Sequence, residues 1–470
     1  MKFNKTVSNK TVNLAGGKAY KQTDKLEFVS ILLTSFLKDQ FYKSENDTAE
    51  KLVDLIGKLD KRFVAKTAVY ARTKFGMRSV SHLVAGEIAK NVKGEQWTKN
   101  FFNKVVYRPD DMLEILSYYC FKYGKPIPNS LKKGLREAIL KFDDYKLAKY
   151  RGEGKAVSMV DLVNLVHPKG TDTLKKLIKG ELRSVDTWEA KLSKAGQESE
   201  SDEELAEAKD KAWKDLILEK KIGYFALLRN LRNILEQSPE ILDKALELLV
   251  DENLIKKSLV LPFRFTTALK AVEETSFDGV RKVIVALNKA VDFALSNVPK
   301  LKGRTLVVLD ESGSMSGRPS EIGSLFTAVL VKACDADLIT FAESARYQNL
   351  NSMDSTLTLT KSINFNGGGT NFHSIFQTAN KPYDRIIILS DMQGWIGYNT
   401  PQAEFNAYKA RTGADPKIYS FDLQGYGTMQ FPEQNVYCLA GFSDKIFDIM
   451  KMLETDKNVL INEIDKINFN

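Results

Sequence analysis

The stretch LVVLDESGSMSG, residues 306–317, brings together one carboxylate and two hydroxyl groups that could do chemistry. Asp310 ends a run of strand-forming aliphatic residues, and Ser312 and Ser314 follow it at alternate positions. Two kinds of site fit this pattern: a nucleophilic serine on a tight turn, or a cation held by oxygen ligands. The other loops of the chain distinguish between them.

Two later loops carry similar polar groups. The glycine-rich stretch NGGGTNF (366–372) contains Thr370, and Ser390-Asp391 directly follows the aliphatic run IIIL. If these segments end parallel strands, their side chains meet at one edge of the sheet. Two carboxylates and three hydroxyls, without histidine or thiolate, suit a hard divalent cation, Mg²⁺ before Mn²⁺ or Ca²⁺. The predicted ligands are Asp310, Ser312, Ser314, Thr370 and Asp391.

A serine nucleophile fits the sequence less well. The nucleophile elbow has the pattern GxSxG, and Ser314 stands where Ser312 would need its second glycine. Of the histidines His82, His167 and His373, only His373 follows one of these loops and is a candidate base. A third interpretation makes Ser314 a simple helix N-cap. The oxygen-ligand interpretation is therefore preferred.

The net positive charge of the chain comes from its first part, residues 1–300. Residues 301–470 contain 15 Lys and Arg against 19 Asp and Glu, which leaves 54 against 41 for residues 1–300. This asymmetry favours a polyanionic partner such as nucleic acid over a generic basic surface. The sequence has no apolar run approaching about 18 residues, and its three cysteines form no CxxC pair. A cytoplasmic protein with reduced thiols and no membrane association is therefore expected.

The elements that must position these residues fall into two patterns. From about residue 26 to residue 297, apolar residues recur at helical spacing, as in 26–38, 111–124 and 238–250. Many short helices without strands predict an α-solenoid, although no clean internal repeat is present. The polar stretch 193–212 is predicted to be a solvated loop and the start of a helix.

From about residue 301 the pattern changes to short aliphatic segments. The predicted strands are 304–310, 336–342, 383–391, 417–423 and 435–441. Between several of them, helices are predicted at 321–333, 372–379 and 401–410. This alternation predicts an α/β, doubly wound parallel sheet covered on both faces. We therefore expect two domains, residues 1–300 and 301–470.

The three polar loops resemble a known metal site. DESGSM, GGGTN and LSD are similar to the metal-ion-dependent adhesion site (MIDAS) of von Willebrand factor A domains. The DxSxS, threonine and aspartate elements of that family match Asp310, Ser312, Ser314, Thr370 and Asp391 in order. The resemblance implies a Rossmann-like domain whose ion is completed by an acidic group of a partner.

The helical part resembles a second family. GYFALLRNLRNILE (223–236), LPFRFTTALKAVE (261–273), SMVDLVNLVHPK (158–169) and residues 125–152 are similar to the TROVE module of the Ro autoantigen proteins and their bacterial or phage relatives. The resemblance implies a ring of HEAT-like repeats followed by a von Willebrand A domain. It also implies a ribonucleoprotein that binds Y-like RNA on its outer face and single-stranded 3′ ends of structured or misfolded RNA in the ring.

Cations of the helical part are the predicted RNA contacts. The densest basic strip supplies Lys133, Arg136, Lys146, Lys149, Arg151 and Lys155. In the Ro family the segment around AKYRG contributes to Y RNA binding, which implies this role for Lys149 and Arg151. Met159 stands where the family often has a histidine, so the role of that histidine is not transferred.

The other predicted RNA contacts each have a structural alternative. His82 either packs through hydrogen bonds or contacts RNA. Arg229 and Arg232 lie three residues apart on one helix face, where they either line the ring cavity or cap helices through carbonyl groups. Arg264, between two phenylalanines, is open to the same two interpretations.

We expect a non-enzymatic, monomeric RNA-binding protein that acts in RNA quality control or couples Y-like RNA to an exoribonuclease. One alternative is a metal-dependent protein-interaction module, in which the A domain captures an acidic group of a partner. Another is an RNA-processing enzyme, although no carboxylate cluster of a nuclease is visible outside the predicted metal site.

Overall fold

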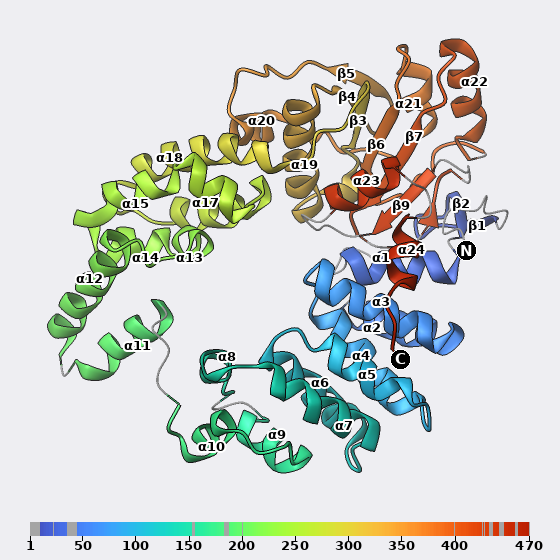
Figure 1. The fold of residues 1–470 in the computed structure, drawn as a ribbon. Helices are drawn as coiled ribbons and strands as arrows, with labels where there is room; N and C mark the ends of the chain where they lie inside the picture. The colour runs from blue at the N-terminus through green and yellow to red at the C-terminus, as the bar shows by residue number, and fades with distance from the viewer. Residues whose placement is uncertain are drawn as a thin grey trace.

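The structure of the 470-residue chain is a computed structural model. It describes residues 10–21, 23–34, 45–152, 156–182, 188–199, 201–398, 400–424, 426, 428–431, 436–440, 446–455 and 459–469. Among the described residues before 298, the regular elements are helices apart from two short strands near the N-terminus (Figure 1). A mixed sheet with its covering helices makes up the rest.

The first helical segment runs from α1 to α10. Its elements are α1 (Asp24–Thr34), α2 (Glu45–Lys58), α3 (Lys61–Lys74), α4 (Ser79–Asn91), α5 (Trp97–Val105), α6 (Pro109–Tyr123), α7 (Asn129–Ala138), η1 (Ile139–Lys141), α8 (Asp144–Lys149), α9 (Met159–Val166) and α10 (Asp172–Lys179). Local sequence sets the helix ends: the Ser158 hydroxyl caps α9, and Gly180 ends α10 in the left-handed conformation. In α7 the buried residues, among them Leu131 and Leu135, recur at helical spacing and form its core face.

The second helical segment runs from α11 to α18. Its elements are α11 (Trp188–Glu198), α12 (Asp202–Leu218), α13 (Tyr224–Arg229), α14 (Leu231–Gln237), η2 (Pro239–Ile241), α15 (Leu242–Leu249), α16 (Glu252–Ser258), η3 (Pro262–Arg264), α17 (Phe265–Glu273), α18 (Val280–Ala294) and η4 (Leu295–Asn297). The stretch 193–212, predicted to be largely loop, is helical at 193–198 and 202–212. Ser201 caps α12 and three acidic residues occupy its first turn, which stabilises a helix in this polar sequence.

The α/β part contains a six-stranded sheet. Its strands are β3 (Thr305–Asp310), β4 (Asp337–Phe341), β5 (Ala345–Gln348), β6 (Arg385–Ser390), β7 (Lys417–Asp422) and β9 (Val436–Ala440), in the order β5-β4-β3-β6-β7-β9. All neighbouring strands are parallel except β4 and β5, which are antiparallel. The five predicted strands form within two residues of their predicted ends. The sequence did not predict β5. Its antiparallel pairing with β4 makes the sheet mixed, whereas a parallel sheet was predicted.

Helices cover both faces of this sheet (Figure 1). α19 (Arg318–Cys334) and α23 (Ile446–Thr455) share one face, where the rings of Phe326 and Phe447 stack with centroids 5.2 Å apart. α21 (His373–Thr378) and α22 (Gln402–Thr412) share the other face, where the centroids of Phe376 and Phe405 are 4.9 Å apart. Beyond these layers, α20 (Thr356–Ser362) packs against α19, and α24 (Val459–Asp465) packs against α3.

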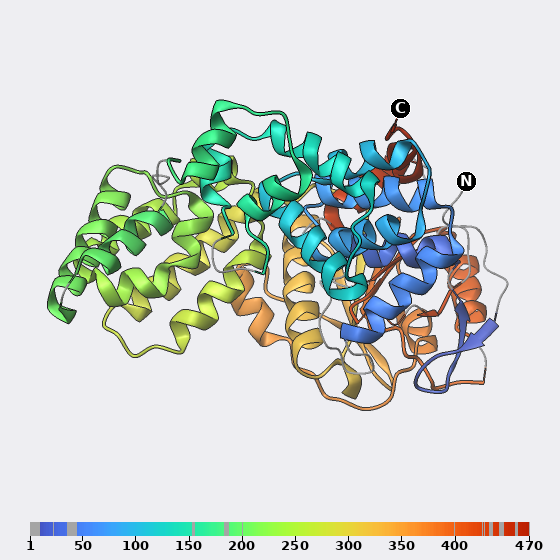
Figure 2. The same ribbon diagram turned by 90° about the horizontal axis from the view of Figure 1, so that it is seen from below.

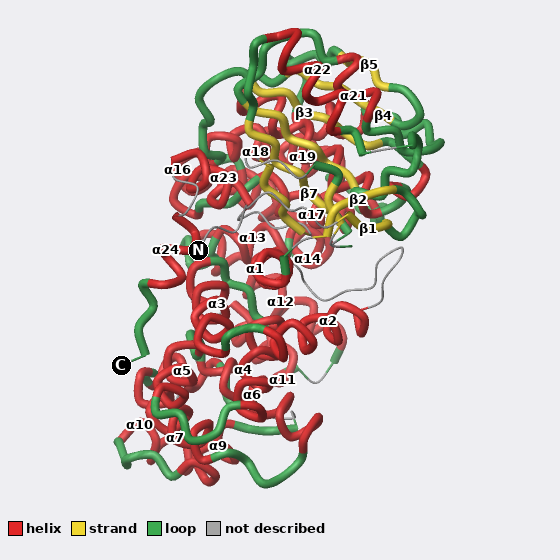
Figure 3. The backbone as a smooth tube through the Cα atoms, turned by 90° about the vertical axis from the view of Figure 1, so that its right-hand side faces the viewer, coloured by secondary structure: helices red, strands yellow, loops and turns green. Residues whose placement is uncertain are grey.

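Both ends of the described chain pack into the opposite part of the molecule. β1 (Lys10–Val12) and β2 (Lys18–Lys21) form a hairpin that pairs with β8 (Thr428–Met429) in a separate three-stranded sheet. At the other end, the ring of Phe469 stacks on Trp97 of α5 with centroids 5.6 Å apart. Figure 3 shows α24 and the C-terminus beside the first helices, which extend away from the sheet. The terminal segments of the described chain therefore pack across the change from helices to sheet near residue 300.

Buried apolar side chains form two cores. The first joins helices of the first segment to the sheet, from Phe28 through Leu306 to Phe469. The second lies within the second helical segment around Trp213 and Phe265. Figure 2 shows this second set of helices on one side of the molecule and the sheet on the other. None of the helices that the structure describes has the length and apolar character that a bilayer crossing requires.

Candidate functional site

The predicted metal ligands lie at the point where the strand order of the sheet reverses. β3 and β6 are parallel neighbours, with Leu309 opposite Leu389, so Asp310 and Asp391 leave the sheet at the same edge. The chain runs from β3 to β4 on one side and returns to β6 on the other. Ligand sites in open α/β sheets lie outside the strand ends at such a position.

Hydrogen bonds join the three polar loops at this edge. The Ser390 hydroxyl donates to Asp310 Oδ2 at 2.5 Å, and the Ser312 N–H donates to Asp310 Oδ1 at 2.9 Å. The glycine-rich loop is held to the first loop by its backbone, because the Gly313 N–H donates to the Gly368 carbonyl at 3.1 Å. The hydroxyl oxygens of Ser312 and Ser314 are 3.4 Å apart. Thr370, two residues beyond Gly368, is also buried.

The two carboxylates of the site are buried together. Burial and the neighbouring charge of Asp391 raise the pKa of Asp310 to about 7. Burial likewise raises the pKa of Asp391, whose Oδ2 atom is buried and accepts no hydrogen bond. Two neighbouring buried carboxylates, one of them with an unsatisfied oxygen, carry negative charge that a bound cation would compensate. The donor set therefore fits a hard divalent cation.

The geometry rules out the N-cap alternative and assigns the nearby carboxylate of Glu311 to an ion pair. Ser314 is not a helix N-cap, because α19 begins at Arg318 with Gly317 as its cap. Glu311, although buried beside Asp310, pairs through both carboxylate oxygens with Arg346 of β5, at 2.5 and 2.9 Å. In the described chain, no group of three or more histidine, cysteine and acidic side chains is arranged to hold a metal. The candidate site consists of two carboxylates and neighbouring hydroxyls.

The N-terminal hairpin contacts the loop that follows Asp391. The Leu14 N–H donates to Gln393 Oε1 at 2.7 Å, and Asn13 Nδ2 donates to the Gly394 carbonyl at 2.6 Å. Gln393 in turn donates its backbone N–H to Asp391 Oδ1 at 3.1 Å and its side-chain amide to the Asp391 carbonyl at 3.0 Å. The hairpin therefore helps to fix the orientation of Asp391.

The predicted RNA contacts of the basic strip divide into two groups. Lys133, Lys146 and Lys149 are exposed on α7 and α8. Arg136 Nε donates to the Val166 carbonyl at 2.5 Å, and Arg151 donates to the Leu182 carbonyl. Both arginines thus join neighbouring helices in addition to carrying charge. Lys155 lies outside the described residues.

The remaining predicted contacts are dispersed. His82 is only 6% exposed and lies 2.8 Å from Asp111 Oδ1 through its Nε2 atom. This geometry corresponds to the packing alternative, with His82 held by a hydrogen bond to Asp111. Arg229 and Arg232 are exposed on α13 and α14, and Arg264 is exposed in η3. They belong to the second helical segment, whereas the basic strip belongs to the first.

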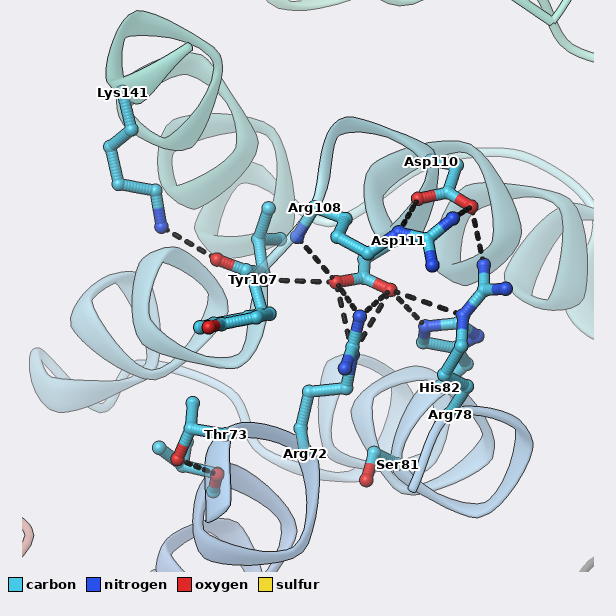
Figure 4. Close-up of polar contacts among 12 residues, drawn as sticks. Arg72, Thr73, Arg78, Ser81, His82, Tyr107, Arg108, Asp110, Asp111 and Lys141 are labelled. Atoms are coloured by element: carbon cyan, nitrogen blue, oxygen red, sulfur yellow. Dashed lines mark hydrogen bonds and ion pairs between the residues drawn. The ribbon is translucent and has the colours of Figure 1, made fainter. Parts of the chain in front are cut away.

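Asp111 organises a buried ionic network between α3, α4 and α6 (Figure 4). Arg72 donates to it from Nε and Nη2, with the shortest distances at 3.0 and 2.9 Å. The backbone N–H groups of Tyr107 and Arg108 donate to Asp111 Oδ2 at 2.9 and 2.8 Å. Burial alone would raise the pKa of Asp111. The hydrogen bond and charge of His82 and the charge of Arg72 outweigh burial and hold this pKa well below its ordinary value.

Sequence reasoning did not single out this network. Asp110 and Asp111 follow Pro109 at the start of α6, where acidic residues are ordinary helix-capping features. Two sequence features were available: the helix start PDD at 109–111, and the basic residues Arg72, Arg78 and His82 in an otherwise apolar stretch. Their coincidence becomes informative only when α3, α4 and α6 are known to pack together.

Comparison with known proteins decides the family. The family model for the TROVE domain matches residues 20–185 and 179–311, which together exceed half of the chain. The chain belongs to the TROVE domain family. This confirms the predicted resemblance. The two matches of this TROVE chain divide near residue 182, between the two helical segments.

The fold of this TROVE chain resembles that of a solved Ro protein. The crystal structure of the Ro (RSR) protein from Deinococcus radiodurans is 18% identical to it, with a TM-score of 0.62. The match covers 94% of this chain and all of the other, so it includes the α/β part.

The curated relatives share only a short region with this TROVE chain. Telomerase protein component 1 is 21% identical in Rattus norvegicus and 20% identical in Mus musculus, each over 139 residues. Each alignment covers 27% of this chain and 5% of the relative. The chain therefore spans a small fraction of the length of these relatives.

Proposed function

We propose that this TROVE chain is an RNA-binding protein of the Ro type. The observation that carries the proposal is the segregation of charge within the fold. The 54 Lys and Arg against 41 Asp and Glu before residue 301 belong to the part that contains the helical segments, whereas the α/β part is acidic. Within this part, Lys133, Lys146 and Lys149 are exposed on α7 and α8. Such side chains neutralise phosphates, which supplies a large share of the affinity for nucleic acid.

The proposal includes an arrangement of the two parts. The helical segments form a ring of HEAT-like repeats, closed by a von Willebrand A-type domain. Its support is that both ends of the helical part contact the α/β part, α1 against β9 and α18 against α20. Y-like RNA binds the basic outer face at α7 and α8. A single-stranded 3′ end of structured or misfolded RNA enters the ring, which admits one strand and excludes a duplex.

The proposed role is cytoplasmic RNA quality control or scaffolding of an exoribonuclease, without catalysis by this chain. Two-metal nucleases use several acidic ligands. Here the predicted ligands beside Asp310 and Asp391 are hydroxyl groups, and the nearby carboxylate of Glu311 is paired with Arg346.

An anisotropy titration of a structured RNA, with and without a 3′ tail of about ten nucleotides, tests the proposal. The tailed RNA should bind more tightly, and its affinity should fall steeply between about 50 and about 200 mM salt. Lys133→Gln and Lys149→Gln should each weaken binding and reduce the salt slope by about one unit or less. Lys381→Gln, in the α/β part and paired with Asp337, is the control. RNA binding that ignores both tail and salt would refute the proposal.

A second proposed function is the capture of an acidic partner at a MIDAS-type site. The unsatisfied Asp391 Oδ2 favours this candidate. Asp310, Asp391, Ser312, Ser314 and Thr370 would hold Mg²⁺. The bound ion would supply the positive charge that a partner carboxylate completes.

Calorimetric titration with Mn²⁺ and Mg²⁺ tests the metal site. Asp310→Ala should remove ion binding, because it deletes one of the two carboxylates. Asp335 is exposed at the end of α19, so Asp335→Asn should leave the affinity unchanged. Equal ion affinity in Asp310→Ala and the unmodified chain would exclude the site.

A further inference from the structure

We propose that Tyr107 forms a stacking platform for an unpaired RNA base, with Arg78 and Arg108 contacting the neighbouring phosphates. The inference rests on the proposed RNA-binding function and adds to it a named contact and single-stranded RNA as the ligand. Neither the basic strip on α7 and α8 nor the metal site includes these residues.

The ring of Tyr107 is exposed and held in place. Tyr107 is 60% exposed, although large aromatic side chains are usually mostly buried. Its backbone N–H is bound to Asp111, and the guanidinium carbon of Arg72 lies 5.3 Å from its ring centroid. Arg72 is itself 3% exposed and fixed by Asp111. The ring therefore lies against a rigid cation and is exposed to solvent over the rest of its surface. Figure 4 shows Tyr107 beside Arg72 and Asp111.

The surroundings of Tyr107 carry more positive than negative charge. Arg78 and Arg108 both pair with Asp110, at 2.5 and 2.8 Å, and Arg78 Nε also lies 3.8 Å from Asp111 Oδ1. Their side chains remain 37% and 36% exposed. Arg72 and Lys141 add two further cations, and Asp111 is the other carboxylate of the network (Figure 4). Because both guanidinium groups are partly exposed and cations outnumber carboxylates in this network, each can also donate to a phosphate.

A second ring extends this surface. The guanidinium carbon of Arg108 lies 4.6 Å from the ring centroid of Tyr150, which orders the arginine. Alternating rings and cations are the pattern that binds single-stranded nucleic acid, because bases stack on the rings while cations follow the backbone. A base inside a duplex has both faces covered and cannot lie on Tyr107. The arrangement therefore selects unpaired RNA.

The test compares a ten-residue oligouridylate with an abasic ribose-phosphate backbone of equal length in the full chain. The unmodified protein should bind the oligouridylate more tightly. Tyr107→Ala should lose about 5- to 100-fold for the oligouridylate and nothing for the abasic backbone. Tyr107→Phe should retain binding, since it keeps the ring. Tyr107→Leu, which still covers Arg72, should lose binding like the alanine variant even if alanine disturbs the fold.

Two controls separate stacking from charge. Arg108→Gln should weaken binding of both ligands equally and lower the salt slope, because it removes a phosphate contact. Tyr398→Ala removes a ring that is 95% exposed in the acidic α/β part and should change nothing. If Tyr107→Leu and Tyr107→Ala bind the oligouridylate like the unmodified protein, the platform is refuted while RNA binding stands. If the unmodified protein binds neither ligand nor structured RNA, the proposed function itself fails.

Discussion

At the scale of single residues, Asp111 shows how one buried charge fixes both a core and a surface. It accepts hydrogen bonds from Arg72, His82 and the backbone of Tyr107 and Arg108, so three helices and one loop depend on it. Asp111→Asn keeps the shape but removes the charge that Arg72 needs. We expect a loss of about 3–5 kcal/mol in the free energy of unfolding at neutral pH, the usual effect of breaking a buried pair.

This contribution should depend on pH in a defined direction. The pKa of Asp111 is lowered in the folded protein, so its stabilisation is complete above the ordinary carboxyl pKa of 3.8. It is lost as the pH falls further, because the unfolded chain then binds the proton more readily. Urea unfolding should therefore show the difference between the protein and Asp111→Asn shrinking below about pH 4. Asp335→Asn, at an exposed position at the end of α19, is the control. A difference that stays constant down to pH 3 would contradict the argument.

The convergence of the candidate metal ligands was predictable from sequence, whereas the network around Asp111 was not. Asp310 and Asp391 directly follow aliphatic runs, and the carboxyl ends of parallel strands converge at one edge whatever the sequence separation. Asp111 belongs to a helix start, where a carboxylate has an ordinary local role. Its bonds to Arg72 and His82 depend on how helices pack, which the local pattern does not encode.

At the scale of elements, the N-terminal hairpin positions the loop after Asp391. Gly17 allows the close approach, since a Cβ atom there would lie 1.9 Å from the Gly394 carbonyl oxygen. Gly17→Ala should therefore displace the hairpin or the loop and disturb Asp391 through Gln393. We expect the affinity for Mn²⁺, measured by calorimetry, to fall by about 10- to 100-fold, as for other residues that orient metal ligands.

A matched substitution in the same hairpin makes this prediction specific. Leu14→Ala removes a half-exposed side chain but keeps the backbone N–H that bonds to Gln393. Its ion affinity should equal that of the unmodified chain. Hydrogen exchange should rise in residues 391–397 of Gly17→Ala only. Unchanged exchange and affinity in Gly17→Ala would show that the hairpin does not orient Asp391.

Elements differed in how far sequence predicted them. The central strands combine β-branched and aliphatic residues with turns at both ends, so their positions are local properties. β1, β2 and β8 are two to four residues long. β1 and β2 form a local hairpin, which is marginal by itself, and its third strand β8 lies about 400 positions further along the chain. No local sequence pattern predicts such a sheet. The antiparallel edge strand β5 is likewise short and polar, with Arg346 turned to Glu311.

At the scale of the whole molecule, two joints connect the helices to the sheet. The first includes the buried ring of Phe469, which is 3% exposed and packs on Trp97 and on Phe101 of α5. The second combines the buried ring of Phe263, stacked on Phe326 of α19 with centroids 4.7 Å apart, with exposed ion pairs. These pairs are Lys361 with Glu273 at 2.7 Å and Lys270 with Glu321 at 2.6 Å. Apolar contacts resist salt, whereas exposed ion pairs contribute at most about 1 kcal/mol each.

The two kinds of contact should therefore respond differently to single substitutions. Phe469→Ala should lower the free energy of unfolding by about 3 kcal/mol, because it empties a buried aromatic site. Lys361→Ala should lower it by less than about 1 kcal/mol. Since Phe469 belongs to the core shared by the sheet and the first helices, hydrogen exchange should rise in α3, α5 and α24 and remain unchanged in α12–α18. Phe265→Leu, in the second core, should give the reverse pattern. A uniform rise in both variants would mean that the two cores unfold as one unit.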